Sequence, residues 1–232
     1  MVAGDSRTHR ELLEAAVEAL EPIIDRIVFV GGVTTILYIS REFDDLRATA
    51  DVDVIVDTNY SELTELEELL RNIGFVPDPE VICRHRKENL VIDLMPVDSS
   101  VLGFSNRWYA KALEHVEVHR IANTEIKLIS FPYFVATKLE AFASRGKGDY
   151  LGSEDMEDLI TVLAGRPSFL VDLIETGGEL LEFIRAEFAR HLQSPDFRDA
   201  LVGNFPRDPV LSIERVLVDL EELAADCEQR SP

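Results

Sequence analysis

Hydrophobic and polar positions change their spacing several times along the first part of the chain, and this pattern predicts alternating helices and strands. Apolar residues recur at helical intervals from Thr8 to Ile24, and Ile27 to Val30 form a short apolar run that two glycines follow. Side chains three and four residues apart share one face of a helix, so the first segment is predicted to be an amphipathic helix. The second is predicted to be a buried strand, followed by a helix from Val33 to about Ser40.

Residues 50–57 alternate acidic with aliphatic side chains, which is typical of a strand with one apolar and one acidic face. A helical pattern follows from Tyr60 to Ile73 and is predicted to end at Gly74. Two hairpins are predicted after it, and the sheet is therefore at least partly antiparallel. Their strands are Val81–Arg86 with Leu90–Met95, turning at residues 87–89, and Val116–Ile121 with Glu125–Ile129, turning at residues 122–124.

Helical spacing dominates from Pro132 to the end of the chain, with loops near residues 145–153, 165–167 and 204–206. We therefore predict two parts: an α/β (α+β) catalytic domain with a mixed sheet over residues 1–130, and a helical C-terminal domain over residues 131–232. A candidate active site would lie in the cleft between them.

The charge of the chain limits its partners. A formal net charge of −21, from 44 acidic and 23 basic residues, argues against a broad cationic face for nucleic acid. It leaves nucleic acid open as a substrate, because a complex that must dissociate needs only a local basic site. Cys83 and Cys227 lie far apart and indicate neither zinc nor a disulfide framework. With no apolar stretch of about 18 residues, we expect a cytoplasmic protein with no membrane partner.

Three acidic residues carry the candidate chemistry. Asp51 and Asp53 are two positions apart on a predicted strand, so their side chains point the same way. Two adjacent carboxylates repel, so either one of them takes up a proton or a cation neutralises the pair, and oxygen ligands at this spacing suit Mg²⁺. Asp93 lies among aliphatic residues of a hairpin strand, where an ionised carboxylate needs a cation or a donor. Three such carboxylates on neighbouring strands can hold two metal ions.

Two glycines precede these acids. Gly31 and Gly32 lie between a predicted strand and a predicted helix, where bare backbone N–H groups can approach a triphosphate. Strand, Gly-Gly turn, helix and Asp-x-Asp strand form a more specific pattern than any one of these motifs. The transferase assignment requires Asp93 to face the Asp51 and Asp53 pair, and a lysine or arginine that fills the space among the three would count strongly against it.

The motifs resemble those of the nucleotidyltransferase superfamily with the DNA polymerase β-like fold. The residues that match the family's motifs, in the same order along the chain, are Gly31-Gly32, Asp51-Val-Asp53 and Asp93. The similarity is closest to the AbiEii-like branch, which includes toxins of bacterial toxin–antitoxin systems. Arg47-Ala-Thr-Ala-Asp-Val-Asp53 resembles an Arg-x-Thr-x-Asp-x-Asp motif of that branch. Lys138-Leu-Glu-Ala and Asp155-Met-Glu-Asp-Leu resemble its later Lys-x-x-Ala and Asp-x-x-Asp-Leu motifs. The spacer between Gly32 and Asp51 is longer than usual, which we attribute to the loop 41–47.

The resemblance implies roles for individual residues. It assigns metal binding and catalysis to Asp51, Asp53 and Asp93, with two Mg²⁺ ions expected. It assigns nucleotide binding to Gly31, Gly32, Thr34, Arg47, Lys138 and Asp155. Several of them have a plainer interpretation: glycines that serve only strand-to-helix packing, an acidic face of an edge strand, a surface lysine, or an acid that the helix dipole favours near a helix N-terminus.

The implied activity is transfer of a nucleoside monophosphate from an NTP to an acceptor hydroxyl. The acceptor is expected to be RNA, such as a tRNA 3′ end, with a possible antitoxin protein as partner. One alternative is a small molecule such as an aminoglycoside or lincosamide, because an acidic protein attracts a cationic substrate. Another is a nucleotide-binding module without turnover.

Overall fold

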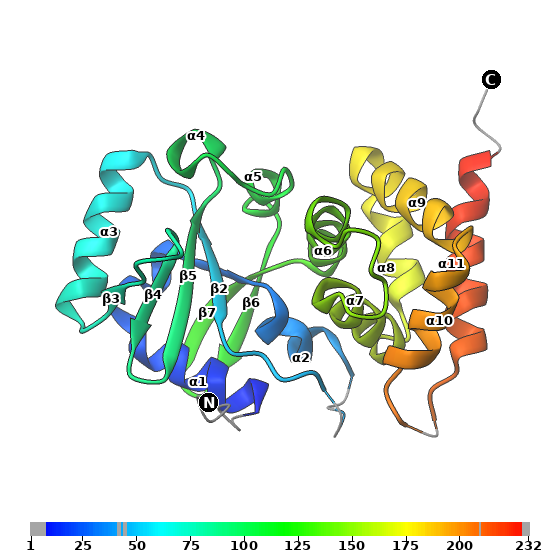
Figure 1. Ribbon diagram of the computed structural model, residues 1–232, viewed down its shortest axis with the longest axis horizontal. Helices are drawn as coiled ribbons and strands as arrows, with labels where there is room; N and C mark the ends of the chain where they lie inside the picture. The colour runs from blue at the N-terminus through cyan, green and yellow to red at the C-terminus, as the bar shows by residue number, and fades with distance from the viewer. Residues whose placement is uncertain (1–7, 41–42, 44–45, 209, 229–232) are drawn as a thin grey trace. The chain divides into compact units, whose positions relative to one another are not determined.

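The computed structural model describes residues 8–40, 43, 46–208 and 210–228. Two compact units are defined by contacts: unit 1, residues 1–34 and 48–130, and unit 2, residues 35–47 and 131–232 (Figure 1). The units divide at residue 130, and residues 35–47 group with the helices. The domains predicted from the sequence stay a prediction. Much of the loop 41–47, to which we attributed the long spacer, lies outside the described residues.

Unit 1 is built on a mixed sheet, as the sequence pattern predicted. Within the described residues the sheet has seven strands in the order β3-β4-β5-β2-β1-β7-β6. Strand β2 runs antiparallel to β1 and parallel to β5, and β1 runs parallel to β7. The strands are β1 (Val28–Val30), β2 (Val52–Val56), β3 (Val76–Pro77), β4 (Arg84–Lys87), β5 (Leu90–Pro96), β6 (Val116–Ile121) and β7 (Thr124–Ile129).

Helices surround this sheet, and α1 packs against β2 and β5 (Figure 1). A capping box between Thr8 and Glu11 starts α1. The helix predicted to reach Ile24 ends earlier and continues as a 3₁₀ turn that contains Pro22, because proline lacks the N–H that an α-helix needs. The helices are α1 (His9–Ala19), η1 (Glu21–Arg26), η2 (Gly32–Thr34), α3 (Tyr60–Asn72), α4 (Ser99–Leu102) and α5 (Tyr109–Ala112).

Unit 2 is helical, as predicted for the C-terminal part. A segment before β2 joins it: the Ser40 N–H donates to the Gly165 carbonyl at 2.9 Å, and a Cβ on Gly165 would lie 2.6 Å from Ile39. No helix among the described residues is long and apolar enough to cross a membrane. The helices are α2 (Thr35–Tyr38), α6 (Phe131–Arg145), α7 (Glu154–Gly165), α8 (Phe169–Thr176), α9 (Gly178–Leu192), α10 (Pro195–Asn204) and α11 (Ile213–Glu228).

A buried histidine lies in the core of unit 2. His191 is fully buried beside aromatic rings, and its Nδ1 lies 2.9 Å from the Tyr150 hydroxyl. Burial lowers the pKa of His191 to about 4, and the charge of Arg190 acts in the same direction. The unfolded chain binds a proton at this residue near pH 6.5, whereas the folded chain stays neutral there until about pH 4. The contribution of neutral His191 to stability is therefore complete above pH 6.5 and is lost as the pH falls toward about 4.

We expect His191→Asn to reduce the pH dependence of stability. Between pH 7 and pH 5 the free energy of unfolding should fall by about 2 kcal/mol more in the wild-type chain than in the variant. Denaturation followed by circular dichroism measures the difference. His119→Asn, at a partly exposed position of β6, is the control and should keep the wild-type slope. Equal slopes in all three proteins would contradict the expectation.

Candidate functional site

The Gly-Gly turn at the end of β1 lies directly against one of the predicted acids. Gly31 has a φ of +78°, and a Cβ placed on it would lie 1.9 Å from Oδ2 of Asp53. Both the backbone conformation and the contact therefore require glycine. Thr34 is buried, and its hydroxyl donates to the Gly31 carbonyl at 2.7 Å. Thr34 thus closes the turn, and its expected contact with nucleotide stays a prediction.

Strand register aligns charged residues across the sheet. Asp53 on β2 is the Cα partner of Asp93 on β5, and Asp93 is in turn the partner of Arg84 on β4. On the other side, Asp53 pairs with Val30, the residue before the Gly-Gly turn. Side chains of paired residues lie on the same face of a sheet. The structure therefore brings Asp53 and Asp93 to one face, beside the glycines.

The Arg84 guanidinium joins two of the three predicted acids. Its Nε and Nη2 donate to the two oxygens of Asp93, both at 2.8 Å, and Nη2 also donates to Oδ2 of Asp51 at 2.6 Å. The hydrogen bonds that Arg84 donates to Asp93 raise the pKa of Arg84, and the charges of Asp93 and Asp51 add to this shift against the effect of burial. Asp93 thus faces Asp51, as the transferase assignment required, but an arginine lies between them, which counts against that assignment.

Three carboxylates on neighbouring strands have the oxygen chemistry that Mg²⁺ prefers. With Arg84 in this position, however, they do not fit a metal ion, because the guanidinium occupies oxygens of both Asp51 and Asp93. Across the described part of the chain, no group of three His, Cys, Asp or Glu side chains is arranged to hold a metal ion. This finding counts against the predicted metal site, and the metal roles of Asp51, Asp53 and Asp93 stay predictions.

The later motifs meet in unit 2 as a buried ionic network. Lys138 on α6 is buried, and its Nζ donates to Asp155 at 3.1 Å and to Asp158 at 2.6 Å, both on α7. Arg145 binds both oxygens of Asp155, and Arg47 binds both oxygens of Asp158. Arg47 of the first motif, Lys138 of the second and both aspartates of the third therefore share one network, although they lie far apart in the sequence.

Shifts in pKa favour the charged forms of Asp155, Asp158 and Arg47 in this network. Burial by itself raises the pKa of Asp155 and of Asp158, but the cations around them outweigh burial and lower both. For Asp155 the largest lowering comes from the hydrogen bond with Arg145, and for Asp158 from the charge of Lys138. Burial by itself lowers the pKa of Arg47, but the charge of Asp158 acts in the opposite direction. The net result is a raised pKa for Arg47. The network therefore gives Lys138, Asp155 and Arg47 a structural role in unit 2.

The predicted site residues fall in both units. Unit 1 holds Gly31, Gly32, Thr34, Asp51, Asp53 and Asp93, and unit 2 holds Arg47, Lys138 and Asp155. The single cleft expected between the two parts stays a prediction. The site residues predicted from the sequence did not include Arg84, Arg145 or Asp158. The sequence contains a signal that could have identified Arg84. If the hairpin turn is taken as the two residues Glu88 and Asn89, Arg84 lies opposite Asp93.

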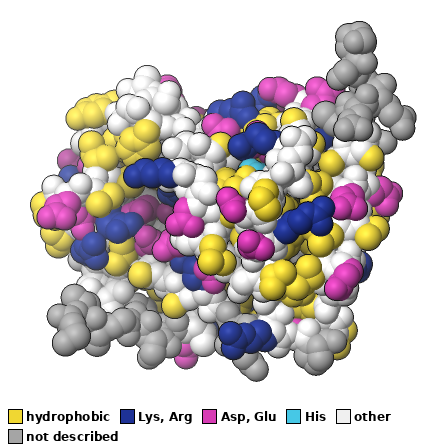
Figure 2. All heavy atoms as spheres, turned by 45° about the vertical axis from the view of Figure 1, so that its right-hand side comes forward, with side chains coloured by type: hydrophobic (Ala, Val, Ile, Leu, Met, Phe, Trp, Pro, Cys, Tyr) yellow, Lys and Arg dark blue, Asp and Glu magenta, His cyan; other side chains and the backbone are white. Residues whose placement is uncertain are grey.

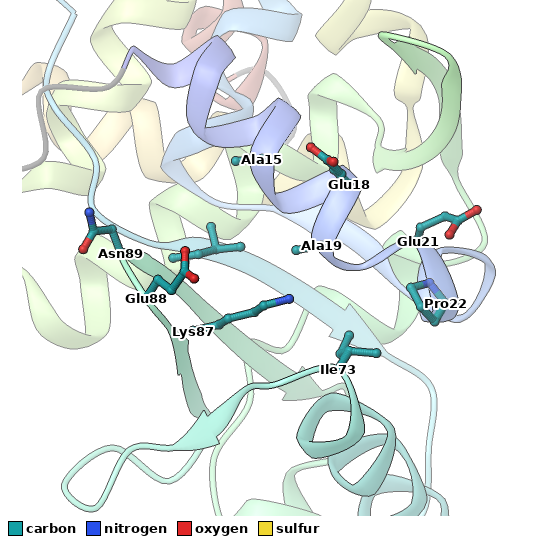
Figure 3. A pocket seen from close by; sticks show the side chains of 10 residues that line it. Ala15, Glu18, Ala19, Glu21, Pro22, Ile73, Lys87, Glu88 and Asn89 are labelled. Carbon is teal, nitrogen blue, oxygen red and sulfur yellow. The ribbon is translucent and has the colours of Figure 1, made fainter.

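A separate cavity of about 630 Å³ opens elsewhere on unit 1. Figure 3 shows it between α1, η1 and the turn of the β4–β5 hairpin. None of the predicted site residues lines it. Its ionisable lining comprises Glu18, Glu21, Glu88 and Lys87, so acids outnumber the one lysine. Such a lining is unfavourable for a triphosphate.

The fold is similar to that of a nucleotidyltransferase-like protein. A solved structure described as an antigenic nucleotidyltransferase-like protein from Paracoccidioides brasiliensis is similar, with a TM-score of 0.51 and 16% sequence identity. The match covers 87% of this chain and 95% of that chain. No protein-family model matches the sequence, and no curated protein matches it. The AbiEii-like branch therefore stays a resemblance.

We expect Gly31→Ala to destabilise the protein more than Gly103→Ala. Gly103 also has a positive φ, of +82°, but no atom lies within 4 Å of a Cβ placed there. Both variants lose about 1 kcal/mol through the backbone conformation. Only Gly31→Ala must also displace Asp53, which should lower its stability by about 2 kcal/mol more. Urea denaturation compares the two, and equal losses would show that Asp53 does not lie against the turn.

We expect Lys138→Met to lower the free energy of unfolding by about 3 kcal/mol or more, because it leaves two buried carboxylates short of a cation. Thermal and urea denaturation measure the loss. Lys147→Met, at an exposed lysine of the same unit, is the matched control and should unfold like the wild-type chain. A Lys138→Met protein as stable as this control would mean that the lysine is free for another role.

Proposed function

We propose that this chain is a nucleotidyltransferase that moves a nucleoside monophosphate from an NTP to an acceptor hydroxyl. The observation that carries the proposal is the contact between the Gly31 turn and Asp53, with Asp93 in register on the next strand. A turn with bare N–H groups can bind phosphate, and carboxylates beside it can bind the cations that accompany phosphate. The nucleotidyltransferase-like fold supports the same class of reaction by analogy.

Dependence on Mg²⁺ is part of the proposal. The resemblance implies it, and the donor chemistry of Asp51, Asp53 and Asp93 supports it. The position of Arg84 opposes it, because this side chain already neutralises Asp51 and Asp93. The strands fix the carboxylates, whereas Arg84 reaches them with a long side chain that is 23% exposed. The metal requirement is therefore a question for experiment.

The position of Arg84 favours a second candidate function. A chain that keeps the glycine turn and the acids, but neutralises two of them with its own guanidinium, could bind a nucleotide without turning it over. Such a module would bind NTP in the absence of divalent metal and would label no acceptor.

The acceptor is proposed to be RNA, with a tRNA 3′ end as the first candidate and a toxin role as its setting. The resemblance to the AbiEii-like branch supports this acceptor. The charge of −21 favours instead a cationic small molecule with free hydroxyls, such as an aminoglycoside. On the face that Figure 2 shows, basic side chains are interspersed with acidic ones. An RNA acceptor would then be held by local contacts.

The test is transfer of label from NTPs that carry it on the α-phosphate. The wild-type chain, with Mg²⁺ or with a chelator, is incubated with total tRNA or with a panel of aminoglycosides and lincosamides. We expect Asp53→Asn to lower labelling by about 100-fold or more, which is typical when a charged group is removed from an active site. Asp57→Asn, at the exposed end of the same strand, should retain wild-type labelling.

The outcomes separate the candidates. Label on RNA or on a small molecule identifies the acceptor class. Calorimetric binding of NTP without labelling of any acceptor would favour the binding module and contradict the transferase. Equal labelling by Asp53→Asn and Asp57→Asn would place the reaction away from this strand.

A further inference from the structure

The acidic site of unit 1 contains one cation that belongs to the chain itself. Arg84 lies on β4, the strand beside Asp93, and was not among the residues expected to act there. We propose that Arg84 is the resident counter-ion of this site: its guanidinium takes the place of a divalent metal ion at Asp51 and Asp93 and competes with such an ion for them. The inference rests on the proposed function only in treating these carboxylates as the site of the reaction.

The geometry of the contacts supports competition. One nitrogen, Nη2 of Arg84, lies 2.6 Å from Oδ2 of Asp51 and 2.8 Å from Oδ2 of Asp93. A magnesium ion that bridged the same two oxygens would lie about 2.0–2.2 Å from each. The nitrogen and the ion would therefore occupy the same space. Nε of Arg84 also binds the second oxygen of Asp93, so neither oxygen of that carboxylate is left without a hydrogen bond.

Charge acts in the same direction as geometry. Asp51, Asp53 and Asp93 together carry three negative charges, which repel one another and would attract a divalent ion strongly. The guanidinium offsets one of these charges and binds Asp93 in the bidentate manner that arginine favours. A divalent ion must therefore break these hydrogen bonds, and its affinity is lowered by their free energy.

Only the Arg84 side chain has to move for a metal ion to reach the carboxylates. Asp93 is anchored on β5, between β2 and β4, and its side chain is only 11% exposed. Arg84 is 23% exposed and has several rotatable bonds between its backbone and its guanidinium. Rotation of this side chain would free the carboxylates without any change in strand pairing. Removal of the guanidinium should then raise the affinity for metal while the fold is kept.

The experiment measures binding of Mn²⁺, the probe, to the full chain by electron paramagnetic resonance, without nucleotide. We expect Arg84→Gln to bind Mn²⁺ about tenfold more tightly than the wild-type chain, or better, because two carboxylates lose their counter-ion. Arg84→Lys keeps the positive charge without the bidentate geometry, so its affinity for Mn²⁺ should lie between that of the wild-type chain and that of Arg84→Gln. Arg86→Gln is the matched control, since Arg86 lies on the same strand, is half exposed and pairs with Asp78.

Further variants locate the ion and guard against misfolding. Adding Asp93→Asn to Arg84→Gln should abolish the gain in affinity, and a gain that survives would overturn the proposal. Mn²⁺ should also raise the melting temperature of Arg84→Gln more than that of Arg86→Gln. Should Arg84→Gln fail to fold, Arg84→Lys decides by the same titration. Affinity equal to that of Arg86→Gln in the folded Arg84 variants would overturn the proposal.

Labelling separates this inference from the proposed function. If Arg84→Gln gains metal affinity and neither it nor the wild-type chain ever labels an acceptor, the counter-ion role stands and the transferase fails. If the wild-type chain transfers label and its Mn²⁺ affinity already equals that of Arg84→Gln, the transferase stands and the counter-ion role is overturned.

Discussion

Repulsion among carboxylates that the strands hold in register is the constraint on which the candidate site depends. The pairing of β2 with β5 places Asp53 beside Asp93, and Asp51 lies just before β2. Hydrogen bonds between strands fix these positions, so the acids cannot separate to relieve the repulsion. A cation is needed beside them. In this fold Arg84 supplies it, from the one neighbouring strand whose register places a guanidinium opposite Asp93.

The helical unit also places carboxylates close together and neutralises them with cations of the chain itself. Asp155 and Asp158 are buried on one face of α7, and Lys138, Arg145 and Arg47 surround them. Each of these carboxylates contacts two of the cations, so removing one cation would leave a buried charge only partly compensated, which is destabilising. The motifs that resemble the AbiEii-like branch are therefore explained here by stability. A role of these residues toward nucleotide would have to come in addition to that structural one.

Hairpin register shows where prediction from the sequence reached its limit. The alternation of polar and apolar residues predicted the β4–β5 hairpin and placed its turn at residues 87–89. The turn has two residues, Glu88 and Asn89, so Lys87 pairs with Leu90 and Arg84 pairs with Asp93. A turn one residue longer would shift every pair by one position and reverse the face that each side chain of one strand occupies relative to the other. A single residue in the turn thus decided which cation meets the acids.

The sequence by itself determined most of the helices and strands, though not β3, α4 or α5, together with the Gly-Gly turn after β1, the alternating strand with Asp51 and Asp53, and the helical C-terminal part. These follow from hydrophobic spacing and from the backbone freedom of glycine, which are properties of neighbouring residues. Only the tertiary structure decided that Arg84 neutralises Asp51 and Asp93, that residues 35–47 join the helical unit, and that Lys138 is buried between two aspartates. Those outcomes depend on strand register and on contacts between separate segments of the chain, and hydrophobic spacing alone does not fix which charges will meet.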